Sequence, residues 1–153
     1  MHGHNDGLWS LNYFADGRQL ISSSVDGAAK IWDSNTGQCT SSLVFHEAKV
    51  YNAVVSPDMT MAATAGVDRK IAVWDLRRAN QPVFVNEDSQ STVSALDFSN
   101  DGKAVISATF GGKVNVIDLE TREQRVDYDI MFLEPEREEE EMCYHLASVK
   151  DHP

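Results

Sequence analysis

Apolar and polar residues alternate along most of the chain with the two-residue period that is typical of β-strands. Short stretches of this alternation are separated by turn sequences rich in Asp, Asn and Gly. The pattern predicts an all-β protein. The predicted strands are 8–13, 19–23, 28–33, 39–44, 50–55, 61–65, 70–75, 83–86, 93–98, 104–108, 113–118 and 123–128.

These strands fall into three groups of four that repeat at a nearly constant interval. Trp32, Trp74 and Ile117 are the second-last residues of equivalent strands and lie 42 and then 43 residues apart, and His4 and His46 are also 42 residues apart. Four short strands in a period of this length are typical of one blade of a β-propeller. We therefore expect one domain over residues 1–130. Its three repeats are predicted at about 3–44, 45–87 and 88–129.

At these landmarks the chain resembles the WD-repeat protein family. The marks are the pair Gly3-His4, the Trp-Asp pairs that begin at Trp32 and Trp74, and an Asp six residues before each Trp. The resemblance implies that a His, a hydroxyl residue, an Asp and a Trp form a hydrogen-bonded tetrad in each of the first two blades. The implied members are His4, Ser22 or Ser24 (of which we assign Ser24), Asp26 and Trp32, then His46, Thr64, Asp68 and Trp74.

The third repeat departs from the family pattern. Ser89, Gly111 and Ile117 stand where His, Asp and Trp would be, so we expect no tetrad there and a looser blade. In the other two blades a buried carboxylate and a buried indole N–H each need a partner. We therefore interpret the tetrads as architectural.

A catalytic function finds no support in the sequence. A catalytic triad occurs once per site, whereas this set of His, Ser and Asp recurs at the repeat period. The chain has no phosphate-binding loop, no zinc spacing and no Gly-x-Ser-x-Gly motif. His2 and His4 could bind a metal near the amino terminus, but the tetrad explains His4 better. We expect a protein that is not an enzyme and that has no cofactor and no metal site.

One rim of the blades is the expected binding surface. In WD-repeat proteins, partners usually dock near the start of the first strand and near the residue before the turn Asp. The resemblance maps this rim onto Gly7, Trp9, Val25, Lys49, Tyr51, Val67, Thr92, Ser94 and Phe110. Because aromatic residues dominate binding hot spots, we hypothesise that Trp9, Tyr51 and Phe110 form one protein-binding site. The alternative is that each ring packs inward between blades.

The charge of the chain argues against nucleic acid as a partner. The formal net charge is −11, and residues 127–153 contribute −7 of it. Such an acidic chain repels phosphates. No apolar run is long enough to span a membrane, and the first residues lack the features of a secretory signal. We expect an intracellular protein, in the cytoplasm or the nucleus, with an acidic tail at 131–153 that is either flexible or a short helix.

Three blades are fewer than the four to eight of typical closed propellers, and an open arc leaves two exposed ends. One explanation is that the chain is a fragment of a longer propeller, which we favour. The other is that two copies close into a ring by self-association. We expect a non-enzymatic scaffold for protein–protein interaction within a larger assembly. The alternative is a structural subunit or fragment that completes a propeller ring by self-association.

Overall fold

The computed structural model describes residues 3–129, which form three four-stranded antiparallel sheets. This arrangement confirms the prediction of an all-β fold built from three propeller blades. Blade 1 contains β1 (Leu8–Tyr13), β2 (Gln19–Ser24), β3 (Ala28–Asp33) and β4 (Cys39–Val44). Blade 2 contains β5 (Val50–Val55), β6 (Met61–Gly66), β7 (Ile71–Asp75) and β8 (Phe84–Asn86). Blade 3 contains β9 (Val93–Phe98), β10 (Ala104–Thr109), β11 (Lys113–Asp118) and β12 (Gln124–Asp129).

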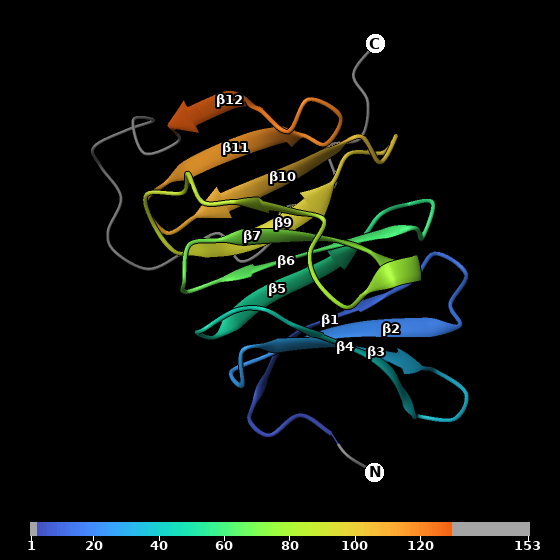
Figure 1. Cartoon of the computed structure of the whole chain (residues 1–153). Coiled ribbons are helices and arrows are strands. Elements are labelled where there is room, and N and C mark those ends of the chain that lie inside the picture. Colours follow the sequence, from blue (N-terminus) through green and yellow to red (C-terminus); the bar gives the residue numbers. More distant parts are fainter. Residues whose placement is uncertain (1–2, 130–153) are drawn as a thin grey trace, which may run out of the picture.

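The blades follow one another in sequence order, with blade 2 between blades 1 and 3 (Figure 1). Within each sheet the strands pair in chain order. The first strands of neighbouring blades are in contact, β1 with β5 and β5 with β9. Each blade is therefore a meander whose first strand lies beside the first strand of the neighbouring blade and whose fourth strand forms the opposite edge of the sheet.

The core consists of two layers, one between each pair of neighbouring blades. Blade 2 contributes to both layers, so β6 and the apolar part of β7 are covered on both faces. Small residues make this possible, because Ala62, Ala63 and Ala65 of β6 are fully buried while larger side chains approach from both neighbours. The strict alternation of apolar and polar residues is consequently lost in this blade.

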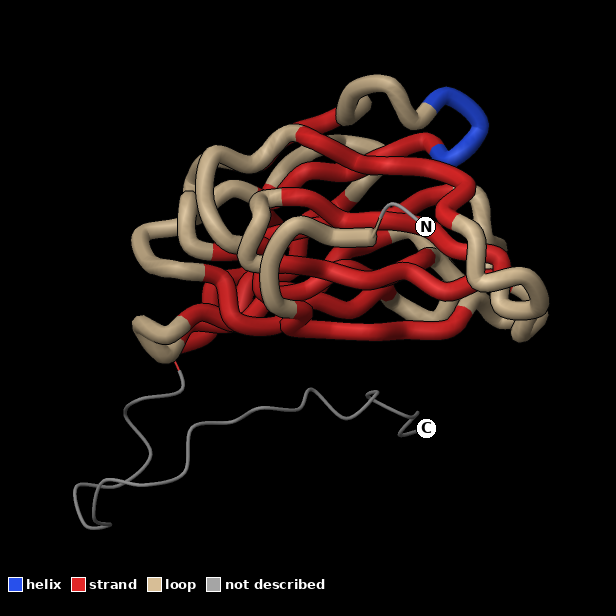
Figure 2. Tube along the Cα trace, turned by 90° about the horizontal axis from the view of Figure 1, so that it is seen from below, coloured by secondary structure: helices blue, strands red, loops and turns tan. Residues whose placement is uncertain are grey.

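The connection between β7 and β8 contains a feature that the sequence patterns did not predict. A short 3-10 helix, η1 (Leu76–Arg78), follows Asp75, whose side chain accepts a hydrogen bond from the Arg77 amide at its start. Figure 2 shows this turn at the periphery of the strands. The Arg77 side chain also donates two hydrogen bonds to Asp75, and these bonds lower the pKa of Asp75 to about 2. The predicted acidic tail at 131–153 and His2 lie outside the described residues.

Candidate functional site

A four-residue network ties the first blade together. The Trp32 indole N–H donates to the Ser22 hydroxyl oxygen at 2.8 Å, and His4 Nε2 lies 2.8 Å from the same oxygen. His4 Nδ1 lies 3.0 Å from Asp26 Oδ2. Because a carboxylate only accepts, His4 Nδ1 is the donor in this last bond. When His4 is neutral, Trp32 therefore donates to Ser22, Ser22 donates to His4, and His4 donates to Asp26.

The hydroxyl of this network is that of Ser22, so the assignment of Ser24 is wrong. The Ser24 hydroxyl instead donates to the main-chain oxygen of Gly7 at 3.0 Å. The two serines lie on the same face of β2, because side chains alternate along a strand. The repeat interval carries the signal that separates them, since Thr64 lies 42 residues after Ser22.

The second blade contains the same network in a more buried form. The Trp74 indole N–H donates to Thr64 Oγ1 at 3.0 Å, and His46 Nε2 lies 2.8 Å from that oxygen. His46 Nδ1 donates to Asp68 Oδ2 at 2.7 Å. Trp74 and Thr64 are fully buried. A buried polar group without a partner lowers the stability of the fold, so each hydrogen bond of this network matters for folding.

Both carboxylates of these networks are held in the ionised form. Burial alone would raise the pKa of Asp68, but the hydrogen bond and the charge of His46, together with the Lys70 amide, lower it below the ordinary value of 3.8. Burial likewise opposes the shift at Asp26, where the Asn5 amide, the His4 side chain and the Ala28 amide lower the pKa. Each Asp therefore links the loop that carries its His to the turn that follows it.

The third blade lacks this network, as the sequence predicts. Ser89 and Ser107 occupy the positions of the His and of the hydroxyl residue, and both side chains are buried. Their hydroxyls have no hydrogen-bond partner within residues 3–129. Thr109 takes over part of the missing role of Asp, because its hydroxyl accepts a bond from the Lys113 amide at 3.2 Å.

Two structural features recur at the rim of each blade, a main-chain hydrogen bond and a β-bulge. The first feature is a main-chain hydrogen bond just before the first strand of each blade. The amide of Val25 donates to the Gly7 oxygen at 2.9 Å, that of Val67 to the Lys49 oxygen at 3.0 Å, and that of Phe110 to the Thr92 oxygen at 3.0 Å. Next to each bond, the pairing between the first and second strands shifts register by one residue. The extra residues are Trp9, Tyr51 and Ser94. Such β-bulges redirect a side chain out of the regular alternation.

The two redirected rings, Trp9 and Tyr51, and the ring of Phe110 form one aromatic cluster that spans the three blades, which we call the aromatic rim. The ring centroids of Trp9 and Tyr51 are 4.7 Å apart, and those of Tyr51 and Phe110 are 5.8 Å apart, both with edge-to-face geometry. Trp9 is 52% exposed and Phe110 is 45% exposed, while Tyr51 between them is half-buried. The rings pack against one another and remain open to solvent on one side.

The other residues mapped to the rim differ in what they offer a partner. Val67 and Lys49 are exposed beside the aromatic rim, and Val25 is half-buried. The Ser94 hydroxyl is already bonded to the Ala108 main-chain oxygen at 3.2 Å. Gly66 allows the tight entrance of blade 2, because a side chain there would collide with the Lys49 oxygen. Lys49 thus adds an exposed positive charge to an apolar surface.

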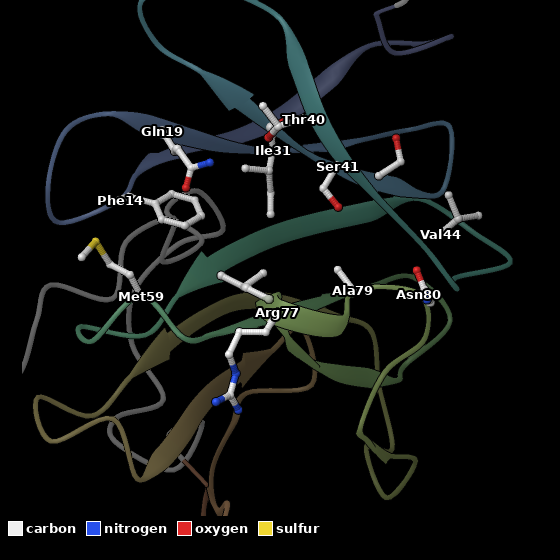
Figure 3. A pocket seen from close by; sticks show the side chains of 12 residues that line it. Phe14, Gln19, Ile31, Thr40, Ser41, Val44, Met59, Arg77, Ala79 and Asn80 are labelled. Atoms are coloured by element: carbon white, nitrogen blue, oxygen red, sulfur yellow. The ribbon is translucent and has the colours of Figure 1, made fainter.

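A groove of about 770 Å³ lies between blades 1 and 2, away from the rim (Figure 3). One wall contains Phe14, Ile31 and Ser41 of blade 1, and the other contains Met59 and the region of η1. The groove forms because blade 2 has the short β8 and the connection at 76–83 in place of a full outer strand. The Arg77 side chain points away from it, toward Asp75.

Two further searches concern only residues 3–129. This part of the chain contains no helix that is long and apolar enough to cross a bilayer. It also contains no group of three or more His, Cys, Asp or Glu side chains placed to hold a metal ion.

Comparison with known protein families finds three matches to the model described as WD domain, G-beta repeat. The matches cover residues 1–33, 37–75 and 80–118, which is more than half of the chain. Their ends coincide with Asp33, Asp75 and Asp118, the last residues of β3, β7 and β11. The repeat found from the spacing of landmark residues and the repeat of the family are therefore in the same register.

Curated relatives carry two kinds of name. Eukaryotic translation initiation factor 3 subunit I of Candida albicans is 33% identical over 122 residues, which are 76% of this chain and 34% of the relative. The protein of that name in Scheffersomyces stipitis is 33% identical over 69% of this chain and 29% of the relative. Cilia- and flagella-associated protein 52 of Chlamydomonas reinhardtii is 30% identical over 78% of this chain and 19% of the relative. The chain spans about a third of the length of these relatives, or less.

Proposed function

Because the chain belongs to the family of the WD domain, G-beta repeat, we propose that it is a non-enzymatic scaffold that binds a protein partner within a larger assembly. The names of two relatives describe a subunit of a translation initiation factor, which favours a role as one component among several. The observation that carries the proposal is the aromatic rim. It brings rings from all three blades onto one solvent-exposed surface.

The aromatic rim has the composition of a binding hot spot. Trp and Tyr are enriched where protein interfaces gain most of their affinity, because they bury a large apolar area with few rotatable bonds. Lys49 is exposed, lies two residues before Tyr51 in the sequence and adds a positive charge. We therefore expect a partner segment that places an apolar side chain against the rings and an acidic group near Lys49.

The networks of blades 1 and 2 have an architectural role in this proposal. Their hydroxyls accept the indole N–H groups and are buried, so they are not available to a substrate. The loops that carry His4 and His46 lead directly into β1 and β5, where Trp9 and Tyr51 are located. By fixing these loops, the two networks hold the aromatic rim in place.

The test is an affinity capture with the purified chain and with the triple variant Trp9→Ala, Tyr51→Ala, Phe110→Ala. We expect the triple variant to lose specific partner proteins while it keeps the circular dichroism spectrum of the parent. Val83→Ala serves as the matched control, because Val83 is 43% exposed on the connection before β8 and not on the rim. If the triple variant folds and captures the same proteins as the parent, the rim is not the binding site.

A further inference from the structure

Each blade has two faces that carry different side chains. We call the face toward the preceding blade the leading face, and the face toward the following blade the trailing face. In β5, Ala53 and Val55 pack with blade 1, whereas Val54 packs with blade 3. Since side chains alternate along a strand, strand pairing assigns every equivalent residue of the three blades to one face or the other.

The contact between blades 2 and 3 shows what each face needs. Blade 3 contributes a leading face of large apolar residues, and blade 2 contributes a trailing face of small and β-branched residues. All of these side chains are buried. The leading face consists of Leu96, Phe98, Val105 and Ile117, and the trailing face includes Ala63, Ala65, Ile71 and Val73.

Blade 1 reproduces this leading face on the side that faces away from blade 2. Strand pairing makes Leu11, Tyr13, Leu20 and Trp32 the equivalents of the four residues on the leading face of blade 3. Leu11 is 57% exposed and Tyr13 is 66% exposed, although Leu96 and Phe98 at the same positions are buried. Trp32 is likewise half-buried, whereas Trp74 is fully buried against blade 1.

Blade 3 reproduces the complementary trailing face at the other end. Ile106, Ala108, Val114 and Val116 are the equivalents of Ala63, Ala65, Ile71 and Val73 in blade 2. The four residues of blade 2 are buried, and the four residues of blade 3 are only half-buried. The outer faces of blades 1 and 3 therefore present the two halves of an interface that blades 2 and 3 already form.

We propose that these two outer faces bind each other between two copies of the chain, so that blade 3 of one copy packs on blade 1 of the other. The contact is head-to-tail, and two such contacts close a ring of six blades, which lies within the four to eight blades of closed propellers. This association goes beyond the proposed binding of a partner and does not involve the aromatic rim.

Polar groups near the first strands add to the contact between blades. Across the boundary of blades 1 and 2, the Ala53 amide donates to the Ser10 hydroxyl at 3.2 Å, and the Asn12 side chain donates to the Ala53 oxygen at 2.9 Å. Leu11 is the equivalent of Ala53 at the free end of blade 1. Blade 3 has Ala95 and Asp97 at the positions of Ser10 and Asn12, so the proposed contact rests on the apolar faces and does not repeat these two hydrogen bonds.

Sedimentation of the full chain over a range of concentrations tests the proposal. We expect a species of twice the 17.0 kDa chain mass that dissociates on dilution. Tyr13→Glu should abolish it, because the substitution places a charge in both contacts, and Ile106→Lys should do the same from the opposite face. Val83→Glu, which alters an exposed apolar residue outside both faces, should leave the mass unchanged.

Mixing the two variants gives the sharpest result. A pair of Tyr13→Glu and Ile106→Lys chains retains one intact contact, so the mixture should recover the doubled mass that neither variant forms alone. Tyr13 is so exposed that its substitution is compatible with folding, and circular dichroism checks this for both variants. A folded parent that stays monomeric, a dimer that survives Tyr13→Glu, or open oligomers longer than two chains would each overturn the proposal. Partner capture by the aromatic rim is measured separately and is unaffected by this outcome.

Discussion

At the scale of single residues, the three blades offer an internal comparison of the same position with and without partners. Thr64 accepts the Trp74 indole N–H and contacts His46 Nε2. Ser107 stands at the equivalent position of blade 3, and its hydroxyl has no partner within residues 3–129. The energetic value of a hydroxyl in this fold therefore depends on the neighbours that each blade supplies.

Thr64→Val and Ser107→Ala should consequently differ in their effect on stability. Thr64→Val leaves two buried ring N–H or N groups unmatched and should lower the free energy of unfolding by about 2 kcal/mol. Ser107→Ala removes a buried hydroxyl that has no partner within residues 3–129 and should change the free energy of unfolding by less than about 1 kcal/mol. Urea unfolding monitored by circular dichroism measures both. Equal losses in the two variants would contradict this account.

The lowered pKa of Asp68 predicts a pH dependence with a definite sign. A carboxyl whose pKa is lower in the folded than in the unfolded state stabilises the fold above its unfolded pKa, about 3.9, and loses this contribution as the pH falls toward the folded value. The difference in unfolding free energy between the parent and Asp68→Asn should thus be largest near neutral pH and shrink below about pH 4. Urea titrations at several pH values measure it, and a difference that grows with acid would exclude the assignment.

The residue scale also shows what the sequence could predict. His4, Asp26 and Trp32 lie in one network as the family resemblance implies, because their spacing is fixed by two short turns. The assignment of Ser24 is wrong because two serines share one face of β2, and it is Ser22 that bonds to Trp32 and His4. The repeat interval contains that information, whereas the local pattern does not.

At the scale of elements, the bulges explain why the sequence could locate the residues of the rim but could not predict the direction in which their rings point. The regular alternation offers two orientations for Trp9 and Tyr51, outward or between the blades. The extra residue in β1 and in β5 breaks the alternation and turns both rings toward the rim. A bulge leaves little trace in a pattern of apolar and polar residues, so only the structure resolves this choice.

The third blade should open more easily than the second. The turn amide of Lys70 donates to the charged Asp68, but the equivalent amide of Lys113 donates to the neutral Thr109 hydroxyl, and bonds to ionised groups are roughly twice as strong. We expect native-state hydrogen exchange to be faster at Lys113 than at Lys70, and faster in β10 and β11 than in β6 and β7. Stronger protection in blade 3 would show that packing alone controls its stability.

At the scale of the whole molecule, blade 2 differs from the other blades because it is covered on both sides. Its strands carry the shared core, and small residues such as Ala62 and Ala65 reflect that position. The sequence predicted three blades and two free ends from the repeat count. It did not predict that the ends match, because the match depends on which face each residue occupies after strand pairing.

The indole rings differ in burial, so tryptophan fluorescence can report separately on different parts of the chain. Each of its three tryptophans senses a different environment, since Trp9 is exposed on the rim, Trp32 faces the free end of blade 1 and Trp74 is enclosed. Indole emission shifts to shorter wavelength when water is excluded. Partner binding should therefore alter the signal of Trp9, ring closure that of Trp32, and unfolding that of Trp74. Blade 3 contains no tryptophan and contributes no indole fluorescence. Variants that keep a single tryptophan would therefore separate the three events by fluorescence.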